Sequence, residues 1–284
     1  MSDSGFTLGL IGFGFLGTAI AYGFAQTCDI KVYDIDPKRS TNTLDEVANC
    51  DYVFICVNTP SFEDGTIDTS YVESALSNVS EHRIRDDNCI ILKSTIVPDT
   101  LLEIVNKYSK LDIVYNPEFL TSRTARFDFI NAARTILAGP QDKIEKVKTL
   151  YKARFHWVPI IETDYVTASM IKYMANCFFA TKISFVNEMR LLCDKNGADW
   201  NTLITGVVAD SRIADSHMQC PGWDGQRGYA SYCFAKDVMA LQAYAERLDV
   251  NTNTLSGGWK TNLEVRPQKD WCDLPGVISK KQVI

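Results

Sequence analysis

Short uninterrupted apolar runs recur along the first half of the chain, and segments of helical length separate several of them. The clearest runs lie at residues 8–11, 30–34, 52–57, 89–95, 112–119 and 135–139. Apolar runs without alternation are typical of strands buried on both faces of a sheet. The pattern therefore predicts an α/β fold for this half of the chain.

The second half has a different pattern, in which long stretches contain neither proline nor glycine. Residues 165–196 form the longest of these, and Gly197 follows as a helix-ending residue. A helix of this length would extend about 48 Å, which is more than one face of a small domain requires. We expect it to link domains or to line a subunit interface. A Gly/Pro loop at 220–231 precedes a second predicted helix at 234–248.

A glycine motif follows the first apolar run directly. Gly12, Gly14 and Gly17 form GxGxxG between a predicted strand and a predicted helix, and Asp34 ends the next strand. This arrangement predicts a Rossmann-like site in which a pyrophosphate faces a helix N-terminus. Asp34 favours NAD over NADP because a 2′-phosphate would meet a carboxylate, and Arg39 softens that preference. The alternative is a glycine-rich turn without a ligand.

Three further runs end in polar turns, at residues 58–60, 93–98 and 116–120. Ligands of open α/β sheets bind at the carboxyl ends of the strands, so these turns are candidate site loops. The alternative for each turn is an ordinary proline turn.

Composition narrows the range of partners. The 284 residues carry a net charge of −6, which argues against binding of nucleic acid or of an anionic membrane. Nine cysteines without a CxxC pair, and only three histidines, argue against a metal site and favour free thiols in a reducing cytosol. Residues 4–28 lack charge, but the acidic residue before them and their six glycines argue against a membrane span. The expected location is cytoplasmic, and it is the host cytoplasm if the gene is viral.

Three side chains of the second half are candidates for chemistry. Cys233 lies at the start of the second predicted helix and close to Lys236, and both features favour a thiolate. The alternative is a cysteine buried by packing. Lys172 and Asn176 are four residues apart and so share one face of the long predicted helix. A helical lysine is usually a solvated charge, but the neighbours of Lys172 are apolar.

Taken together, the motifs resemble those of the UDP-glucose/GDP-mannose dehydrogenase family, most closely its UDP-glucose-oxidising members. The matching segments occur in the family's order between about residues 8 and 245: GFGFLG with Asp34, FICVNTP, DGTIDTSYV, STIVP, NPEFL, MIKYMANCFFATKISFVNE, DSRI and GYASYCFAKD. Several ordered motifs are more specific than any one of them. The resemblance implies a Rossmann-like NAD-binding domain followed by an all-helical central, dimerisation domain.

The resemblance also implies an activity, the NAD-dependent four-electron oxidation of a nucleotide sugar's C6 alcohol to a uronic acid. The expected reaction takes UDP-glucose to UDP-glucuronate through a thiohemiacetal and a thioester on a cysteine. An alternative is a catalytically impaired partner of a full-length dehydrogenase, which binds NAD and a nucleotide sugar. A β-hydroxyacid-type dehydrogenase would not need Cys233.

Residue roles follow from the resemblance, motif by motif. It implies that Cys233 is the nucleophile, that Lys172 and Asn176 stabilise an oxyanion, and that Asp237 works with a water. Thr95 and Glu118 would line the reacting groups. The implied cofactor contacts are Gly12, Gly14, Phe15, Leu16, Gly17, Asp34, Arg39, Thr59, Pro60, Thr95 and Lys236. The implied substrate contacts are Glu118, Phe119, Leu120, Lys172, Asn176, Arg212, Gly228 and Tyr229, with Arg212 reaching across a subunit interface of a homodimer.

The expected domains are an NAD-binding domain at 1–160, a helical substrate and dimerisation domain at 161–254, and a tail at 255–284. The family's third, UDP-binding domain does not fit in this tail, so the resemblance implies a short form. One hypothesis is that Trp259, Arg266 and Trp271 replace that domain by stacking on the substrate's base.

Several positions depart from the family's pattern. Ser122 stands where the family commonly has a glutamate, which is a candidate base for thioester hydrolysis. Ala230 and Ser231 replace a Gly-Gly pair, and Ala235 replaces a proline. Glycine adopts backbone angles that other residues avoid, so these changes imply a differently shaped substrate loop.

Overall fold

The computed structural model describes residues 5–280 and contains two compact units. One unit comprises the residues up to Thr59 together with Asp68–Lys172, and the other comprises Pro60–Ile67 together with the residues from Tyr173 onward. These units do not coincide with the three domains expected from the sequence, which stay a prediction.

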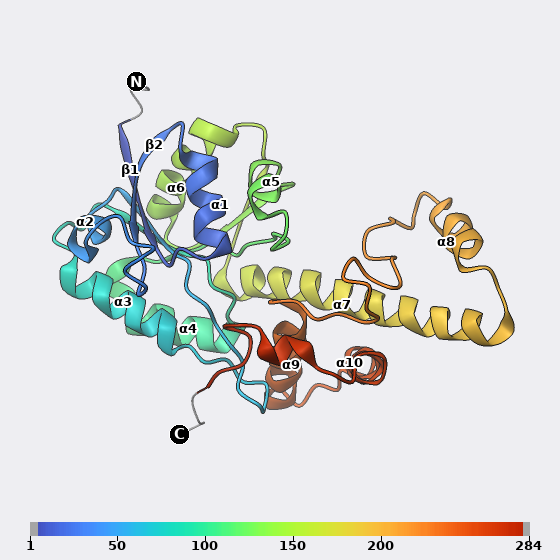
Figure 1. Cartoon of the computed structure of the whole chain (residues 1–284). Coiled ribbons are helices and arrows are strands. Elements are labelled where there is room, and N and C mark those ends of the chain that lie inside the picture. The colour runs from blue at the N-terminus through green and yellow to red at the C-terminus, as the bar shows by residue number, and fades with distance from the viewer. Residues whose placement is uncertain (1–4, 281–284) are drawn as a thin grey trace. The chain divides into compact units, whose positions relative to one another are not determined.

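The first unit is built on one sheet of seven strands in the order β2-β1-β3-β4-β5-β6-β7 (Figure 1). The strands are β1 (Phe6–Ile11), β2 (Cys28–Tyr33), β3 (Tyr52–Ile55), β4 (Cys89–Leu92), β5 (Val114–Tyr115), β6 (Thr135–Ala138) and β7 (Ile160–Thr163). Neighbouring strands are parallel except β5 and β6, which pair antiparallel. The α/β class predicted from the apolar runs is confirmed.

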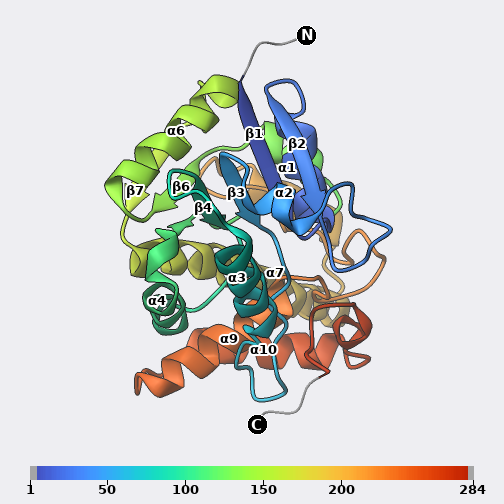
Figure 2. The same cartoon turned by 90° about the vertical axis from the view of Figure 1, so that its left-hand side faces the viewer.

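Helices cover both faces of this sheet, as the turned view shows (Figure 2). One core joins the sheet to α1 (Phe15–Phe24), α5 (Ala125–Ile130) and α6 (Gln141–Phe155). The other joins it to α2 (Leu44–Ala48), α3 (Ser70–His82) and α4 (Pro98–Lys107), and η1 (Ser109–Leu111) follows α4. Within β1, Leu8 and Leu10 belong to the first core and Ile11 to the second, because successive strand residues point to opposite faces.

The strand order places the candidate binding region. Strand β1 lies between β2 and β3, so the chain leaves β1 in one direction and later returns to its other side. Open α/β sheets bind ligands at such a reversal, outside the carboxyl ends of the strands. The turns after β1 and β3 therefore bound the expected crevice.

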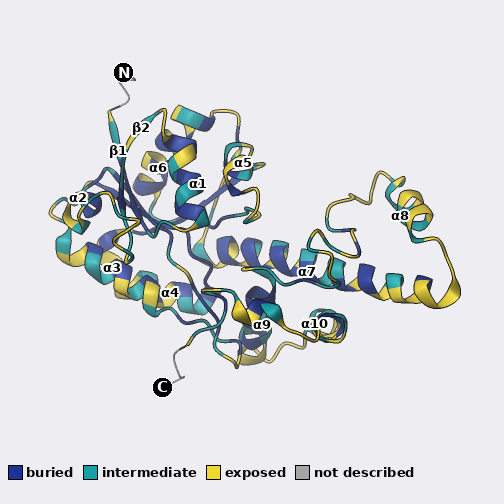
Figure 3. Cartoon of the chain, in the orientation of Figure 1, coloured by how far each residue is buried: buried dark blue, intermediate teal, exposed yellow. Residues whose placement is uncertain are grey.

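The second unit is helical. Its elements are the part of α7 (Tyr165–Asn196) that begins at Tyr173, α8 (Trp200–Val208), α9 (Phe234–Arg247), α10 (Asn253–Val265) and η2 (Asp270–Asp273). The predicted long helix and the predicted helix at 234–248 are both present. The core of this unit contains Trp271 and Val277, whereas α8 contains no buried residue (Figure 3). Residues beyond 254 are thus part of the helical unit's core.

Within residues 5–280, none of the helices combines the length and the apolar character that crossing a membrane would require.

Candidate functional site

The three glycines of the turn after β1 have different roles. Gly12 has a φ of +91°, in the left-handed region that favours glycine, and a Cβ there would lie 2.9 Å from the Cys56 carbonyl oxygen. A Cβ on Gly17 would lie 2.2 Å from the Gly12 carbonyl oxygen. A Cβ on Gly14 would meet no protein atom within 4 Å. Two of the glycines therefore serve the fold, and the third leaves open space.

That open space lies at a helix N-terminus. Gly14 is the N-cap of α1, whose first turn begins with Phe15 and Leu16, and no side-chain hydrogen bond caps the helix at this residue. The backbone N–H groups of a first turn point outward, and together with the positive end of the helix dipole they favour a phosphate. The space that a Cβ on Gly14 would fill therefore fits the pyrophosphate of a dinucleotide.

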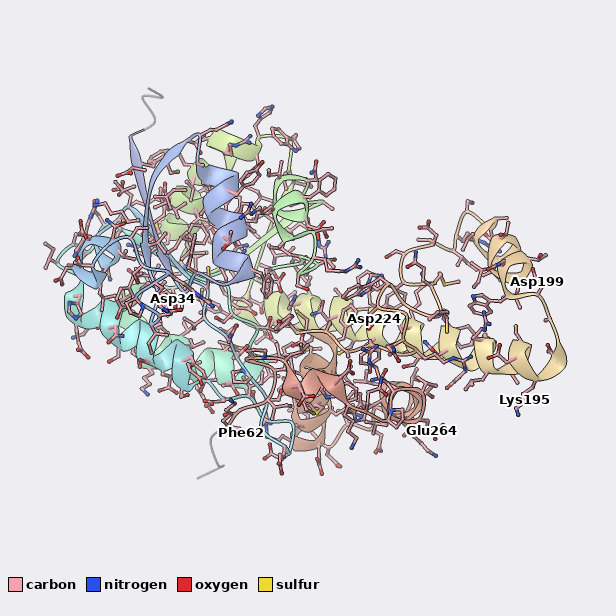
Figure 4. All side chains as sticks on the ribbon, viewed as in Figure 1. Asp34, Phe62, Lys195, Asp199, Asp224 and Glu264 are labelled. Carbon is pink, nitrogen blue, oxygen red and sulfur yellow. The ribbon has the colours of Figure 1, made fainter. Side chains whose placement is uncertain are left out.

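Asp34 follows β2 and joins the second strand to the glycine turn (Figure 4). Its Oδ2 accepts a hydrogen bond from the Phe13 N–H at 2.6 Å, and its Oδ1 accepts one from the Asp36 N–H at 2.9 Å. Each carboxylate oxygen retains a second lone pair, which suits ribose hydroxyls. Arg39 forms an ion pair with Asp36 at 3.5 Å, and its expected effect on cofactor preference stays a prediction.

The turns after β3 and β4 are tied to each other. The Thr59 hydroxyl donates to the Thr95 carbonyl oxygen at 2.9 Å, and the Ser94 hydroxyl donates to the Val57 carbonyl oxygen at 2.7 Å. Thr59 and Thr95 are both buried. Pro60, a further expected cofactor contact, begins the segment that belongs to the second unit.

A buried ion pair joins the turn after β5 to the start of α7. The Lys172 Nζ lies 3.0 Å from Glu118 Oε1, and the two side chains are 1% and 7% exposed. Glu118 Oε2 accepts the Leu120 N–H at 2.6 Å, and Lys172 Nζ lies 5.6 Å from the centre of the Phe119 ring. Four of the expected substrate contacts are therefore neighbours within the first unit.

Lys93 is a buried cation that the sequence reading did not single out as a site residue. Its Nζ donates to Asn116 Oδ1 at 2.9 Å, and the Tyr151 hydroxyl donates to the same oxygen at 2.6 Å. Burial lowers the pKa of Lys93 to about 8, while Cys56 and Glu118 act in the opposite direction. Lys93 and Glu118 line one cavity of about 250 Å³. The sequence signal that could have identified Lys93 is its position directly after a buried apolar run.

In the second unit, Cys233 is the N-cap of α9 and is partly exposed. The Ser231 hydroxyl oxygen accepts the N–H groups of Cys233 at 3.4 Å and of Phe234 at 3.3 Å. Other thiols differ in environment, since burial raises the pKa of Cys50 to about 11 and that of Cys56 to about 12. The predicted position of Cys233 at a helix N-terminus is confirmed, and its role as a nucleophile stays a prediction.

Asp237 lies one turn into α9 and is fully buried. Its Oδ1 accepts Lys236 Nζ at 2.6 Å, and its Oδ2 accepts Asn176 Nδ2 at 2.6 Å. A carboxylate with two such donors is held in one orientation. Three of the expected site residues therefore form one hydrogen-bonded group.

The altered loop before Cys233 does not need the lost glycines. Within residues 5–280, the positive φ angles of this loop are at Gly225 and Gly228, and neither Ala230 nor Ser231 has one. The two replacements therefore introduce no left-handed strain. Ser231 instead supplies the hydroxyl that accepts the N–H groups at the start of α9.

Two further expected residues have clear surroundings. The Arg212 side chain is 86% exposed and pairs with Asp210 at 2.5 Å, so its expected role at a subunit interface stays a prediction. The hypothesis of a base-stacking tail is wrong for Arg266 and Trp271, which are 3% and 2% exposed. Arg266 pairs with Asp224 and Asp270 instead, and Trp271 is packed in the core.

Family comparisons match most of the chain. Residues 38–155 match the NAD binding domain of the UDP-glucose/GDP-mannose dehydrogenase family, and residues 166–264 match that family's central domain. The first match agrees with the fit of the glycine turn and Asp34 to a dinucleotide, so NAD is the cofactor.

Curated relatives include the UDP-glucose 6-dehydrogenase of Rickettsia felis, 36% identical over 229 residues, which are 76% of this chain and 48% of the relative. Another is the UDP-glucose 6-dehydrogenase TuaD of Bacillus subtilis, 36% identical over 79% of this chain and 49% of the relative. The chain thus spans about half the length of these curated relatives.

Solved structures share the fold. A UDP-glucose dehydrogenase from Pyrobaculum islandicum superposes with a TM-score of 0.82 at 26% identity, over 93% of this chain and 69% of that one. A UDP-D-ManNAc dehydrogenase from Pyrococcus horikoshii superposes with a TM-score of 0.78 at 21% identity, over 91% of this chain and 68% of that one. The second likeness concerns the fold alone.

Proposed function

Because this chain belongs to the UDP-glucose/GDP-mannose dehydrogenase family, we propose that it is an NAD-dependent nucleotide-sugar 6-dehydrogenase. The proposed substrate is UDP-glucose, and the product is UDP-glucuronate. The primary alcohol, two NAD⁺ and one water would give the carboxylate, two NADH and three protons. The observation that carries the proposal is the partly exposed Cys233 at the N-terminus of α9, four residues before the buried Asp237.

The first unit supplies the cofactor site in this proposal. NAD, when bound, accepts a hydride ion from the substrate's C6 carbon in each of the two oxidations. The turn from Gly12 to Gly17 would hold its pyrophosphate, and Asp34 would accept hydrogen bonds from its ribose hydroxyls. The open space at Gly14 supports this assignment.

Cys233 explains how a single site could perform both oxidations. The first oxidation yields an aldehyde, and the Cys233 thiolate attacks its carbonyl carbon while the oxygen gains a proton, which forms a thiohemiacetal. The second oxidation leaves a thioester. Water then adds to the thioester carbon, and the thiol departs as the carboxylate forms. The nucleophile thus holds the intermediate between the two steps.

Lys172 and Asn176 are the donors proposed for the negatively charged oxygen of these steps. They lie one turn apart on α7, and each is bound to a carboxylate, Lys172 to Glu118 and Asn176 to Asp237. Donors that are already oriented lower the cost of charge on the substrate oxygen. Asp237 would act as a base through a water molecule, since a carboxylate is suited to accepting protons.

Ser122 favours a second candidate, a chain that forms the thioester but releases it slowly or not at all. The family's glutamate is missing at this position, so Glu118 is the carboxylate that this turn offers for activating water. Such a chain would act as a binding partner of a full-length dehydrogenase. A stable acyl adduct on Cys233, seen by mass spectrometry after mixing with substrate and NAD, would distinguish it from the active enzyme.

A homodimer through the helical unit is part of the proposal. Large apolar side chains on α7 are exposed, with Met174 at 71%, Phe178 at 62%, Phe185 at 58% and Leu192 at 56%. Exposed apolar surface of this kind is typical of protein interfaces. Sedimentation of the purified chain measures its association state. A cytoplasmic location, expected from the free thiols, stays a prediction.

The test of function follows NADH absorbance with UDP-glucose as the limiting reagent. We expect two NADH per UDP-glucose, and we expect Cys233→Ser to form no UDP-glucuronate because its hydroxyl is a far weaker nucleophile. Cys28→Ser is the matched control, since Cys28 is also partly exposed but lies in the first unit. Full product formation by Cys233→Ser would contradict the mechanism. Absence of NADH with UDP-glucose, GDP-mannose and UDP-N-acetyl sugars would favour the binding partner.

A further inference from the structure

The loop that leads to Cys233 is held through its backbone. Over Arg227 to Tyr229, four polar backbone groups are bound by side chains of α7, of α10 and of Arg266, the C-cap of α10. The Gly228 N–H donates to Asn187 Oδ1 at 3.2 Å, and Arg266 Nη1 donates to the Arg227 carbonyl oxygen at 3.3 Å. The Tyr229 N–H donates to Asn262 Oδ1 at 2.7 Å, and Asn262 Nδ2 donates to the Tyr229 carbonyl oxygen at 3.2 Å.

Asn262 makes the most specific of these contacts. Its amide binds both the N–H and the C=O of one residue, as a neighbouring strand would do. The side chain is fully buried, so its hydrogen bonds are not shared with solvent. Arg266 is the C-cap of α10 and is itself fixed by Asp224 and Asp270.

The approach of Asn262 depends on a glycine. Gly228 has a φ of +68°, and a Cβ there would lie 2.4 Å from Asn262 Oδ1 and 3.3 Å from the Arg266 Cβ. A side chain at this position would clash with Asn262 Oδ1 in the place where it binds the loop, and its backbone would be strained at this φ. Gly228, expected to contact substrate, therefore also has a role within the protein.

Tyr229 connects the part of the loop that Asn262 binds to the residue next to the Cys233 thiol. Its ring is buried and meets the Phe234 ring edge-on, with centroids 6.0 Å apart, and the Trp259 ring of α10 lies 6.2 Å away. Phe234 is the first residue of α9 and follows Cys233 directly. Cys233 thus lies between a backbone fixed at residue 229 and a ring fixed at residue 234.

We propose that Asn262 is a positioning residue for Cys233, through its hold on the backbone of Tyr229. The inference rests on the proposed function, because it concerns how fast the thiolate captures the aldehyde. A misplaced thiolate adds to the carbonyl carbon more slowly, so the aldehyde leaves after the first oxidation. The defect then appears as a changed product ratio and not only as a lower rate.

The experiment compares Asn262→Ala with Thr261→Val in the full chain. Thr261 is the adjacent buried residue of α10, but its hydroxyl binds Glu188 of α7 and the Gly257 carbonyl oxygen instead of the loop. Hydroxylamine is added to convert escaped aldehyde to an oxime with loss of water. We expect Asn262→Ala to yield between one and two NADH per UDP-glucose consumed, with oxime as the remainder. We expect Thr261→Val to keep two NADH and form no oxime, even if it is less stable.

Equal product ratios in the two variants would overturn the proposal, since loss of folded protein lowers the rate without changing the ratio. If the wild-type chain oxidises no nucleotide sugar, the proposed function fails, and thiol labelling decides the inference instead. In that case the rate of iodoacetamide labelling of Cys233 at alkaline pH is measured from peptide masses and is compared with the rate for Cys28 of the first unit. Labelling several-fold faster in Asn262→Ala alone supports a loosened loop, and an unchanged rate overturns the positioning role.

Discussion

Two helices begin at the residues on which the proposed chemistry depends, and the segments before them are held in different ways. The glycine turn before α1 is held by β2 and the residue directly after it, with the Gly12 N–H on the Tyr33 carbonyl oxygen at 3.0 Å and the Phe13 N–H on Asp34 Oδ2 at 2.6 Å. The loop before α9 is held by the side chains of Asn187, Asn262 and Arg266. The turn therefore follows from the strands themselves, whereas the loop depends on helices distant in the sequence.

The turn and the loop also differ in how far along the sequence their supporting residues lie. The side chains that bind the loop backbone are 33 to 41 residues away from it. The turn instead needs glycines at fixed positions within one motif. We therefore expect substitutions of Gly12 or Gly17 in the turn to disturb fold and cofactor binding together, and substitutions around the loop to act on the placement of one thiol.

The largest expected effect is that of Gly17→Ala. The new Cβ would lie 2.2 Å from the Gly12 carbonyl oxygen, and a backbone atom cannot move aside as a side chain would. We expect the free energy of unfolding of the first unit to fall by about 3 kcal/mol and NAD binding to be lost. Denaturant unfolding and titration calorimetry with NAD measure the two effects.

Gly14→Ala is the control that separates the ligand from the fold. A Cβ at Gly14 meets no protein atom within 4 Å, so we expect the free energy of unfolding to change by no more than about 1 kcal/mol. NAD affinity should still fall at least tenfold, because the methyl group enters the proposed pyrophosphate space. Unchanged NAD affinity in Gly14→Ala would place the pyrophosphate elsewhere.

A smaller effect is expected where Arg266 supports the loop. Arg266→Met keeps the volume but removes the partner of two carboxylates, of which Asp270 is 41% exposed. Because both carboxylates still reach water, we expect a loss of about 2 kcal/mol. Arg212→Met is the control, since that side chain is 86% exposed. Tryptophan fluorescence follows unfolding of the helical unit, which contains four of the five tryptophans, the buried Trp271 among them.

Arg266→Met is also expected to change how the stability of the protein depends on pH. The hydrogen bonds from Arg266 hold the pKa of Asp270 below its ordinary value. A lowered folded-state pKa contributes stability above the unfolded value of about 3.9 and loses it as pH falls through the folded value. We expect the wild-type stability to fall more steeply below about pH 4 than that of Arg266→Met. Parallel pH curves for the two proteins would contradict this linkage.

The contrast also explains what could be predicted from the sequence. Periodicity and the glycine motif predicted six of the seven strands and the position of Asp34 after the second strand, because these features show in neighbouring residues of the chain. Strand β7 was not predicted, and the binding crevice stays a prediction. The resemblance supplied Cys233, Lys172, Asn176 and Asp237 as candidates. The structure adds that Asp237 binds both Lys236 and Asn176, a grouping that no spacing reveals.

Long-range contacts account for what the sequence did not reveal. Trp271 and Arg266 were expected at a substrate surface because they are aromatic and basic, but the fold buries both. Lys93 lay in a turn already singled out, yet its value as a buried cation depends on Asn116 and Tyr151 from other elements. Residue type alone does not distinguish a ligand-facing group from one that supports the fold.

The smallest expected effect concerns Ser231, which makes local hydrogen bonds within the loop. Its hydroxyl oxygen accepts the N–H groups of Cys233 and Phe234 at 3.4 and 3.3 Å, and those groups are the ones that a thiolate at the N-terminus of α9 would use. Ser231→Gly, which restores a glycine of the family's pattern, releases them. We expect iodoacetamide to label Cys233 about two- to fivefold faster at neutral pH, with a loss of about 0.5 kcal/mol in unfolding free energy.

Ser231→Ala releases the same groups without the added backbone freedom, so equal acceleration in both variants assigns the effect to the hydroxyl. Acceleration in the glycine variant alone would mean that loop flexibility, which α10 otherwise restrains, governs the thiol.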